Sequence, residues 1–112
     1  MADRDELEAK LAVIKRDYVA AISARATSLH SAWILTQSED WALPSLRELH
    51  RLVHSLAGSG ATFGFADLSA HAHALELPLK ALLEDPSVDR SALPELFEAL
   101  MAELAAVSKQ NA

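Results

Sequence analysis

The sequence of 112 residues has no cysteine, only three glycines and four prolines, and no long uninterrupted apolar run. The absence of cysteine excludes disulfides and thiolate chemistry, which suits the reducing cytoplasm. Few glycines and prolines, with 51% hydrophobic residues, argue against disorder and favour a compact soluble fold. No stretch approaches the roughly 18 apolar residues of a membrane span. We therefore expect one cytoplasmic domain over residues 1–112, with no membrane partner.

Positive charge is scarce as well. The formal net charge is −6, the isoelectric point is about 5.2, and the ten lysines and arginines are scattered along the chain. Such a chain repels a phosphate backbone, so we expect no nucleic-acid partner. A protein or a small ligand is the better candidate for a binding partner.

Apolar residues recur at every third or fourth position, which is typical of amphipathic helices. Short polar connectors separate four such stretches, and no strand-like alternation is present. The expected helices cover roughly residues 4–35, 42–62, 66–84 and 90–107. We predict an all-α fold, an up-down-up-down antiparallel four-helix bundle. The first helix is expected to direct inward Leu7, Leu11, Ile14, Tyr18, Ile22, Leu29 and Trp33.

Glycine and proline mark where these helices stop or bend. Gly64 is the best candidate for the end of the second helix, because glycine readily adopts the backbone conformation that ends a helix. Pro78 lies inside the third stretch and predicts a kink, or an early end followed by a short extra turn. Asp89 or Ser91 is expected to cap the fourth helix.

The most informative segment spans residues 49–76. His54 stands four residues after His50, so both side chains project from one helical face. Small residues occupy the following turn at Ala57, Gly58 and Ala61. A histidine bordered by so little side-chain bulk is open to the surface of another protein, which predicts a docking face.

A neutral imidazole is a competent nucleophile towards phosphorus, because one ring nitrogen carries a lone pair while the other holds the proton. Glu76 is the natural partner for the N–H of His54, since the third helix must return antiparallel to the second around Gly64. A carboxylate that accepts Nδ1–H would leave Nε2 facing outward as the attacking atom. A lone helical histidine is more often satisfied by a carbonyl group, so the surrounding residues must decide.

The run His54-Ser55-Leu56-Ala57-Gly58-Ser59-Gly60-Ala61-Thr62-Phe63-Gly64-Phe65 resembles the phosphotransfer motif of the histidine phosphotransfer (Hpt) family. Its end, Thr62 to Phe65, is most similar to the phosphotransfer domain of chemotaxis-type histidine kinases. The close similarity covers residues 49–76, and the remainder agrees in helix pattern only. The resemblance implies a phosphoprotein that acts as a phosphorelay intermediate of two-component signalling, with transient phosphohistidine.

The resemblance also implies roles for individual residues. His54 would accept a phosphoryl group from a histidine kinase or receiver domain and pass it to a response-regulator aspartate. Glu76 would orient His54, and His73 would be a member of the same network. We expect no enzyme activity and no ATP site, no cofactor in this chain, Mg²⁺ in the partner receiver, and a monomer. The expected partner-binding residues are Arg47, His50, Arg51, Ala57, Gly58 and Ala61.

One position departs from the family pattern, because Ala57 stands where the family usually has a lysine. The loss of that cation leaves open a second hypothesis, an adaptor that docks a receiver domain through the same face without phosphorylation. A third hypothesis is a histidine-rich metal-binding bundle with a site made of His50, His54, His73 and Glu76. The His50–His54 pair could share a metal, but the segment between them lacks the glutamate of the zinc-protease motif, so no metal site is expected.

Overall fold

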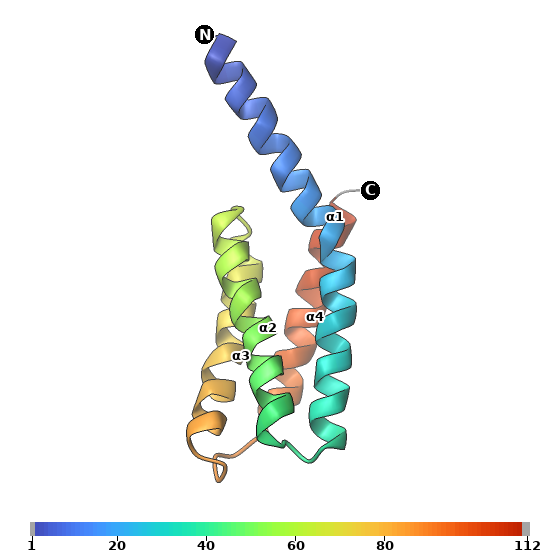
Figure 1. Cartoon of the computed structure of the whole chain (residues 1–112), viewed down its shortest axis with the longest axis vertical. Helices are drawn as coiled ribbons and strands as arrows, with labels where there is room; N and C mark the ends of the chain where they lie inside the picture. Colours follow the sequence, from blue (N-terminus) through green and yellow to red (C-terminus); the bar gives the residue numbers. More distant parts are fainter. Residues whose placement is uncertain (1, 111–112) are drawn as a thin grey trace.

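The computed structural model describes residues 2–110, which form four α-helices (Figure 1). Their bounds are Ala2–Ser38 for α1, Leu43–Thr62 for α2, Ala66–Glu84 for α3 and Leu93–Lys109 for α4. Consecutive helices run in opposite directions, and α1 closes the bundle against α4. The fold is therefore the all-α, up-down-up-down four-helix bundle predicted from the periodicity. No helix among the described residues is long and apolar enough to cross a bilayer.

The core is built from the apolar stripes that the sequence pattern indicated. Leucine dominates it, and most core side chains are fully enclosed. Burying a leucine contributes on the order of 1.5–3 kcal/mol, so a dozen such side chains supply the main drive for folding. The largest enclosed side chains are Ile22, Leu29, Leu46, Leu49, Leu68, Leu75, Leu79, Leu93, Leu100, Leu104, Val53 and Val107.

The N-terminal half of α1 extends beyond the other three helices (Figure 1). Leu7, Leu11 and Ile14 are 57%, 56% and 47% exposed, so the prediction that they face the core is wrong. The cause is length: α1 has 37 residues and α2 has 20, so its first turns pass the end of the α2–α3 hairpin. Burial begins at Tyr18, which stacks on Phe63 near that end.

Removing residues 1–14 should therefore leave the bundle almost as stable as before. The deleted turns bury little apolar surface, and Lys15, which contacts the Phe65 ring, is kept. We expect the free energy of unfolding to change by less than about 1 kcal/mol, because changes outside a core usually have small effects. Urea unfolding followed by circular dichroism measures this, and a loss of several kcal/mol would show that the extension supports the bundle.

Pro78 and the start of the fourth helix were the two uncertain points in the predicted helix pattern. The third helix continues through Pro78 to Glu84, the expected last residue, so the alternative of an early end at Pro78 is wrong. The fourth helix begins at Leu93 instead of residue 90, because Asp89 accepts hydrogen bonds from the backbone N–H and hydroxyl of Ser91. The two residues expected to cap the fourth helix therefore bond to each other instead. The N-cap position is Ala92, which makes no side-chain cap bond.

Candidate functional site

The turn between α2 and α3 sets the geometry of the site. Gly64 has a φ of +82°, which is the left-handed conformation that glycine adopts without strain. The N–H of Phe65 then donates to the carbonyl of Gly60 at 2.8 Å, and the N–H of Gly64 donates to the carbonyl of Ala61 at 3.2 Å. These bonds close α2 as predicted and send α3 back along it after three residues.

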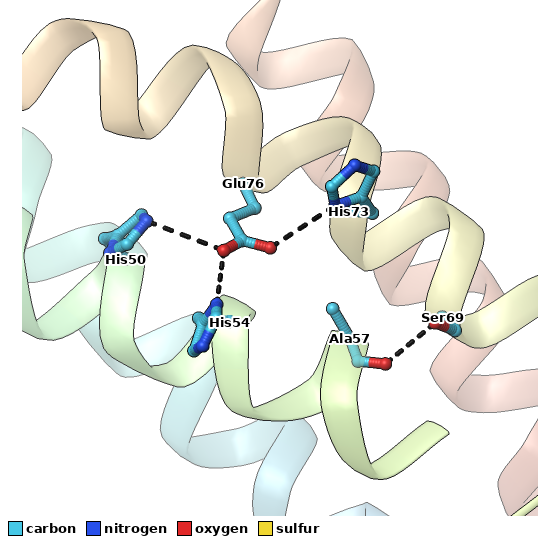
Figure 2. Close-up of polar contacts among 6 residues, drawn as sticks. All are labelled: His50, His54, Ala57, Ser69, His73 and Glu76. Carbon is cyan, nitrogen blue, oxygen red and sulfur yellow. Dashed lines mark hydrogen bonds and ion pairs between the residues drawn. The ribbon is translucent and has the colours of Figure 1, made fainter. Parts of the chain in front are cut away.

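Two contacts fix how α2 and α3 lie side by side. Gly60 is buried, and a Cβ atom built on it would stand 3.1 Å from the backbone nitrogen of Ser69. Any larger residue would push the helices apart, so glycine permits the close approach. The hydroxyl of Ser69 donates to the carbonyl of Ala57 at 2.7 Å, as Figure 2 shows. This bond lies one turn from His54 and sets the register of the hairpin.

That register brings His54 of α2 to Glu76 of α3. The Nδ1 atom of His54 is hydrogen-bonded to the Oε1 atom of Glu76 (Figure 2). Glu76 is an ionisable acceptor, so the bond selects the tautomer in which Nδ1 carries the proton. The Glu76 side chain is 12% exposed and the His54 side chain is 70% exposed. The carboxylate thus holds the inner edge of a ring that remains open to solvent.

Two further imidazoles surround the same carboxylate. His73 lies one turn before Glu76 on α3, and its Nδ1 stands 3.5 Å from Oε2. His50 lies one turn before His54 on α2, and its Nε2 stands 3.9 Å from Oε1. His73 is 62% exposed and His50 only 22%. The structure therefore brings together Glu76, His54 and His73, as expected, and adds His50 from the inner side.

The environment of Glu76 keeps it ionised. Burial by itself would raise its pKa, but the hydrogen bond and charge of His54 lower it, with smaller contributions from His73 and His50. The balance leaves the pKa of Glu76 below its usual value of 4.5. At neutral pH the carboxylate is charged, so it can stabilise positive charge that develops on the ring of His54 when Nε2 attacks an electrophile.

The family-model comparison agrees with this geometry. The model described as the Hpt domain matches residues 4–110, nearly the whole chain. The chain belongs to the Hpt domain family. Hpt domains are phosphotransfer carriers in the phosphorelays of two-component signalling, and they interact with histidine kinases and receiver domains. No curated protein and no solved structure gives a significant match.

The surface beside the His54 ring of this Hpt domain is made of small residues. Gly58 and Ala61 are exposed and Ala57 is half-buried, so nothing bulky follows His54 on this face. A Cβ atom at Gly58 would meet nothing within 4 Å. Next to this face lies a shallow hollow of about 440 Å³, lined by Ala61, Gly64, Ala66, Ser69, Ala70 and His73. A partner surface can therefore approach the ring closely from the side of Ala61.

The arginines of the expected partner face differ in their availability. Arg51 is bonded to Glu48 by two hydrogen bonds, of 2.9 and 2.6 Å, so its charge is already compensated. Arg47 is exposed and stands two turns before His54. With alanine at position 57, Arg47 is the better candidate to attract an acidic partner from this helix.

Metal coordination has no support in the described part of the chain. Among residues 2–110, no group of three or more histidine, aspartate or glutamate side chains is arranged to hold a metal ion. His50 and His54 point at the same carboxylate, and their rings stack 6.1 Å apart. The sequence hypothesis of a metal-binding bundle therefore gains nothing from the geometry.

Sequence reasoning missed part of the support around this site. Gly60 was not distinguished from the other glycines, although it is the one that allows α2 and α3 to touch. Ser69 was not noticed, although its bond to Ala57 fixes the register. His50 was placed on the partner face, whereas its Nε2 atom is buried against Glu76. The spacing of His50, four residues before His54, was the available signal for the last of these.

Proposed function

We propose that His54 is the phosphoryl carrier of this Hpt domain. The lone pair on Nε2 attacks phosphorus, the N–P bond forms, and the bond from phosphorus to the donor atom breaks as the donor leaves with its electron pair. The ring then carries positive charge, which the Glu76 carboxylate stabilises through Nδ1–H. In the second half of the reaction, an aspartate oxygen of a receiver domain takes the phosphoryl group and returns the neutral ring.

One observation carries this proposal. His54 is the exposed member of a hydrogen bond whose other member, Glu76, is almost enclosed. An exposed imidazole without a fixed partner would sample both tautomers and many orientations. The bond to Glu76 restricts the ring to one tautomer with Nε2 turned to the solvent, which lowers the entropic cost of reaching the reactive geometry.

The chain needs little else for phosphoryl transfer. We propose that the donor is a histidine kinase or a phosphorylated receiver, and that the acceptor receiver supplies both its aspartate and a bound Mg²⁺ ion. The Mg²⁺ and the acceptor pocket would neutralise charge on the transferring phosphoryl group. The Hpt domain contributes an oriented nucleophile on a surface that a partner can reach.

The proposal is tested by a transfer profile. The protein is incubated with each purified histidine kinase of its host and radiolabelled ATP, and labelled protein is then mixed with each purified receiver domain. We expect label that is stable in base and labile in acid, as for a phosphoramidate, and rapid loss of that label to at least one receiver. Absence of label with every kinase and every phosphorylated receiver would refute the carrier role.

The small-residue face gives a separate prediction about docking. Ala61→Trp should slow transfer to the cognate receiver by about tenfold or more, because the bulky ring would prevent close contact at the centre of an interface. Labelling by phosphoramidate, a small donor, should be unchanged because it needs no protein contact. Ala105→Trp on α4, also at an exposed position, is the matched control. Equal receiver transfer by both variants would remove Ala61 from the docking face.

Ala57 favours one alternative function, an adaptor that binds a receiver without accepting phosphate. The family's usual cation is missing there, and Arg51 on the same helix is bonded to Glu48. The two functions differ in a binding experiment. An adaptor would bind the receiver equally well as wild type and as His54→Ala, and neither protein would take label, whereas a carrier takes label at His54.

A further inference from the structure

His50 carries the one orphaned polar atom among the buried side chains of residues 2–110. Its Nε2 is inaccessible to solvent and has no hydrogen-bond partner. Oε1 of Glu76 lies 3.9 Å from it, about 1 Å beyond a normal N–H···O bond. A buried polar group without a partner destabilises the fold. The position therefore carries a cost that needs an explanation.

The same oxygen explains why the bond is not made. Oε1 already accepts the hydrogen bond from Nδ1 of His54, and the two imidazoles approach it from successive turns of α2 (Figure 2). The facing carboxylate favours the tautomer of His50 with the proton on Nε2, because a lone pair there would be repelled. His50 is thus positioned close to Oε1 as a second donor, but it makes no hydrogen bond to that atom while His54 donates to it.

The proposed reaction contains a state in which the first donor is lost. After Nε2 of His54 bonds to phosphorus, the ring can release its Nδ1 proton to solvent. Nδ1 then presents a lone pair and can no longer donate to Glu76. Oε1 would then have no donor, while Oε2 would keep its neighbour, the Nδ1 atom of His73 at 3.5 Å, so the carboxylate could turn away from the His54 ring. The position of His50 matches this need, since a small rotation of either side chain closes the 3.9 Å gap.

We propose that His50 is a positioning residue. When Nδ1 of His54 no longer donates a hydrogen bond to Oε1 of Glu76, Nε2–H of His50 donates to that oxygen and keeps the carboxylate directed at the His54 ring. This role rests on the proposed function of His54 as the carrier. His50 does not touch the phosphoryl group. It acts through Glu76, which alternates between two donors according to the state of the carrier.

Few other groups can interfere with this exchange. Within 4.0 Å of the Glu76 carboxylate, the described charged or titratable side chains are His50 and His54 from α2 and His73 from α3 itself. His73 uses the other oxygen, Oε2. Further along the two helices stand Arg47, Arg51 and Lys80, of which Arg51 is bonded to Glu48. The buried side chains of α4, which packs on α3, are apolar.

Two variants of His50 distinguish a hydrogen-bond donor from a side chain that only fills space. His50→Leu removes the N–H, and His50→Gln keeps one at the place of Nε2. We expect His50→Leu to take label from phosphoramidate at the wild-type rate, because His54 still donates to Glu76 before it is phosphorylated. Transfer from phosphorylated His54 to the cognate receiver should slow by about tenfold, the lower end of the range for groups that orient a reactive side chain.

The controls define what rescue and failure mean. His50→Gln, which keeps an N–H, should transfer its label to the receiver at the wild-type rate. His71→Leu, which removes an exposed imidazole elsewhere on α3, should also behave as wild type. A wild-type rate of transfer from His50→Leu to the receiver would overturn the positioning role. A wild-type protein that takes no label would instead refute the carrier role, so the two failures are distinguishable.

A measurement on the wild-type protein stands even if His50→Leu does not fold. In ¹⁵N-imidazole NMR spectra, phosphorylation of His54 should move the Nε2–H proton of His50 downfield and slow its exchange with solvent, at pH values where Nδ1 is deprotonated. Both changes report a new hydrogen bond at His50. An Nε2–H signal that is the same in the free and phosphorylated proteins would overturn the proposal.

Discussion

Replacing His54 with glutamine should abolish phosphorylation of this Hpt domain. Glutamine keeps an amide near the position of the ring but has no nucleophilic nitrogen, so we expect labelling by kinase and ATP to fall by at least about 1000-fold, as when other nucleophiles are removed. The fold should be unaffected, because the His54 side chain is 70% exposed and its loss removes no core contact.

The matched control for that variant is His71→Gln. His71 is an exposed histidine on α3, and the structure shows no hydrogen bond or ion pair from it to Glu76. It should take label at the wild-type rate. Circular dichroism and thermal unfolding of both variants show that the bundle is intact. Label that persists in His54→Gln would move the phosphorylation site to another residue and refute the assignment.

Replacing Glu76 with glutamine should slow labelling of His54 by about 10- to 100-fold without moving the site. The amide oxygen still accepts Nδ1–H, so the ring keeps its orientation. The negative charge that stabilises the developing imidazolium is lost. Initial rates with phosphoramidate measure this effect without a contribution from docking. A rate equal to wild type would remove the charge of Glu76 from the mechanism.

The same pair of proteins gives a pH test whose sign follows from the lowered pKa of Glu76. A carboxylate with a depressed pKa in the folded state stabilises the fold above its unfolded value, and this contribution is lost as the pH falls through the folded value. The pKa of Glu76 lies below its usual value of 4.5. The contribution of the Glu76 carboxylate to the stability of wild type, measured against Glu76→Gln, should therefore be lost only as the pH falls below 4.5. Urea unfolding across that range measures the difference.

The helices could be predicted because their apolar spacing and their breakers agree. Leu49, Val53 and Leu56 recur with helical spacing and are all buried, and Gly64 ends α2 as its conformational freedom suggested. The exposure of Leu7 and Leu11 could not be predicted in this way. Periodicity reports that a helix has an apolar face, but it does not report whether neighbouring helices reach far enough to cover it.

The pairing of His54 with Glu76 was predictable for a similar reason. A short turn at Gly64 forces an antiparallel hairpin, so residues at matching distances from the turn must face each other. The spacing of His50 from His54 indicated that they share a helical face, but it did not indicate that Nε2 of His50 is buried against Glu76. That burial depends on the close approach of α2 and α3, which Gly60 and Ser69 permit through contacts visible only in three dimensions.

The nitrogen that carries the phosphoryl group tests the account most directly. The wild-type protein, labelled with phosphoramidate and uniformly with ¹⁵N, is examined by NMR for coupling between phosphorus and the ring nitrogens. Because Glu76 holds Nδ1 of His54, the coupling should appear at Nε2 of that residue and nowhere else. Phosphorus bonded to Nδ1 of His54, or to any other side chain, would contradict the arrangement on which the proposed function depends.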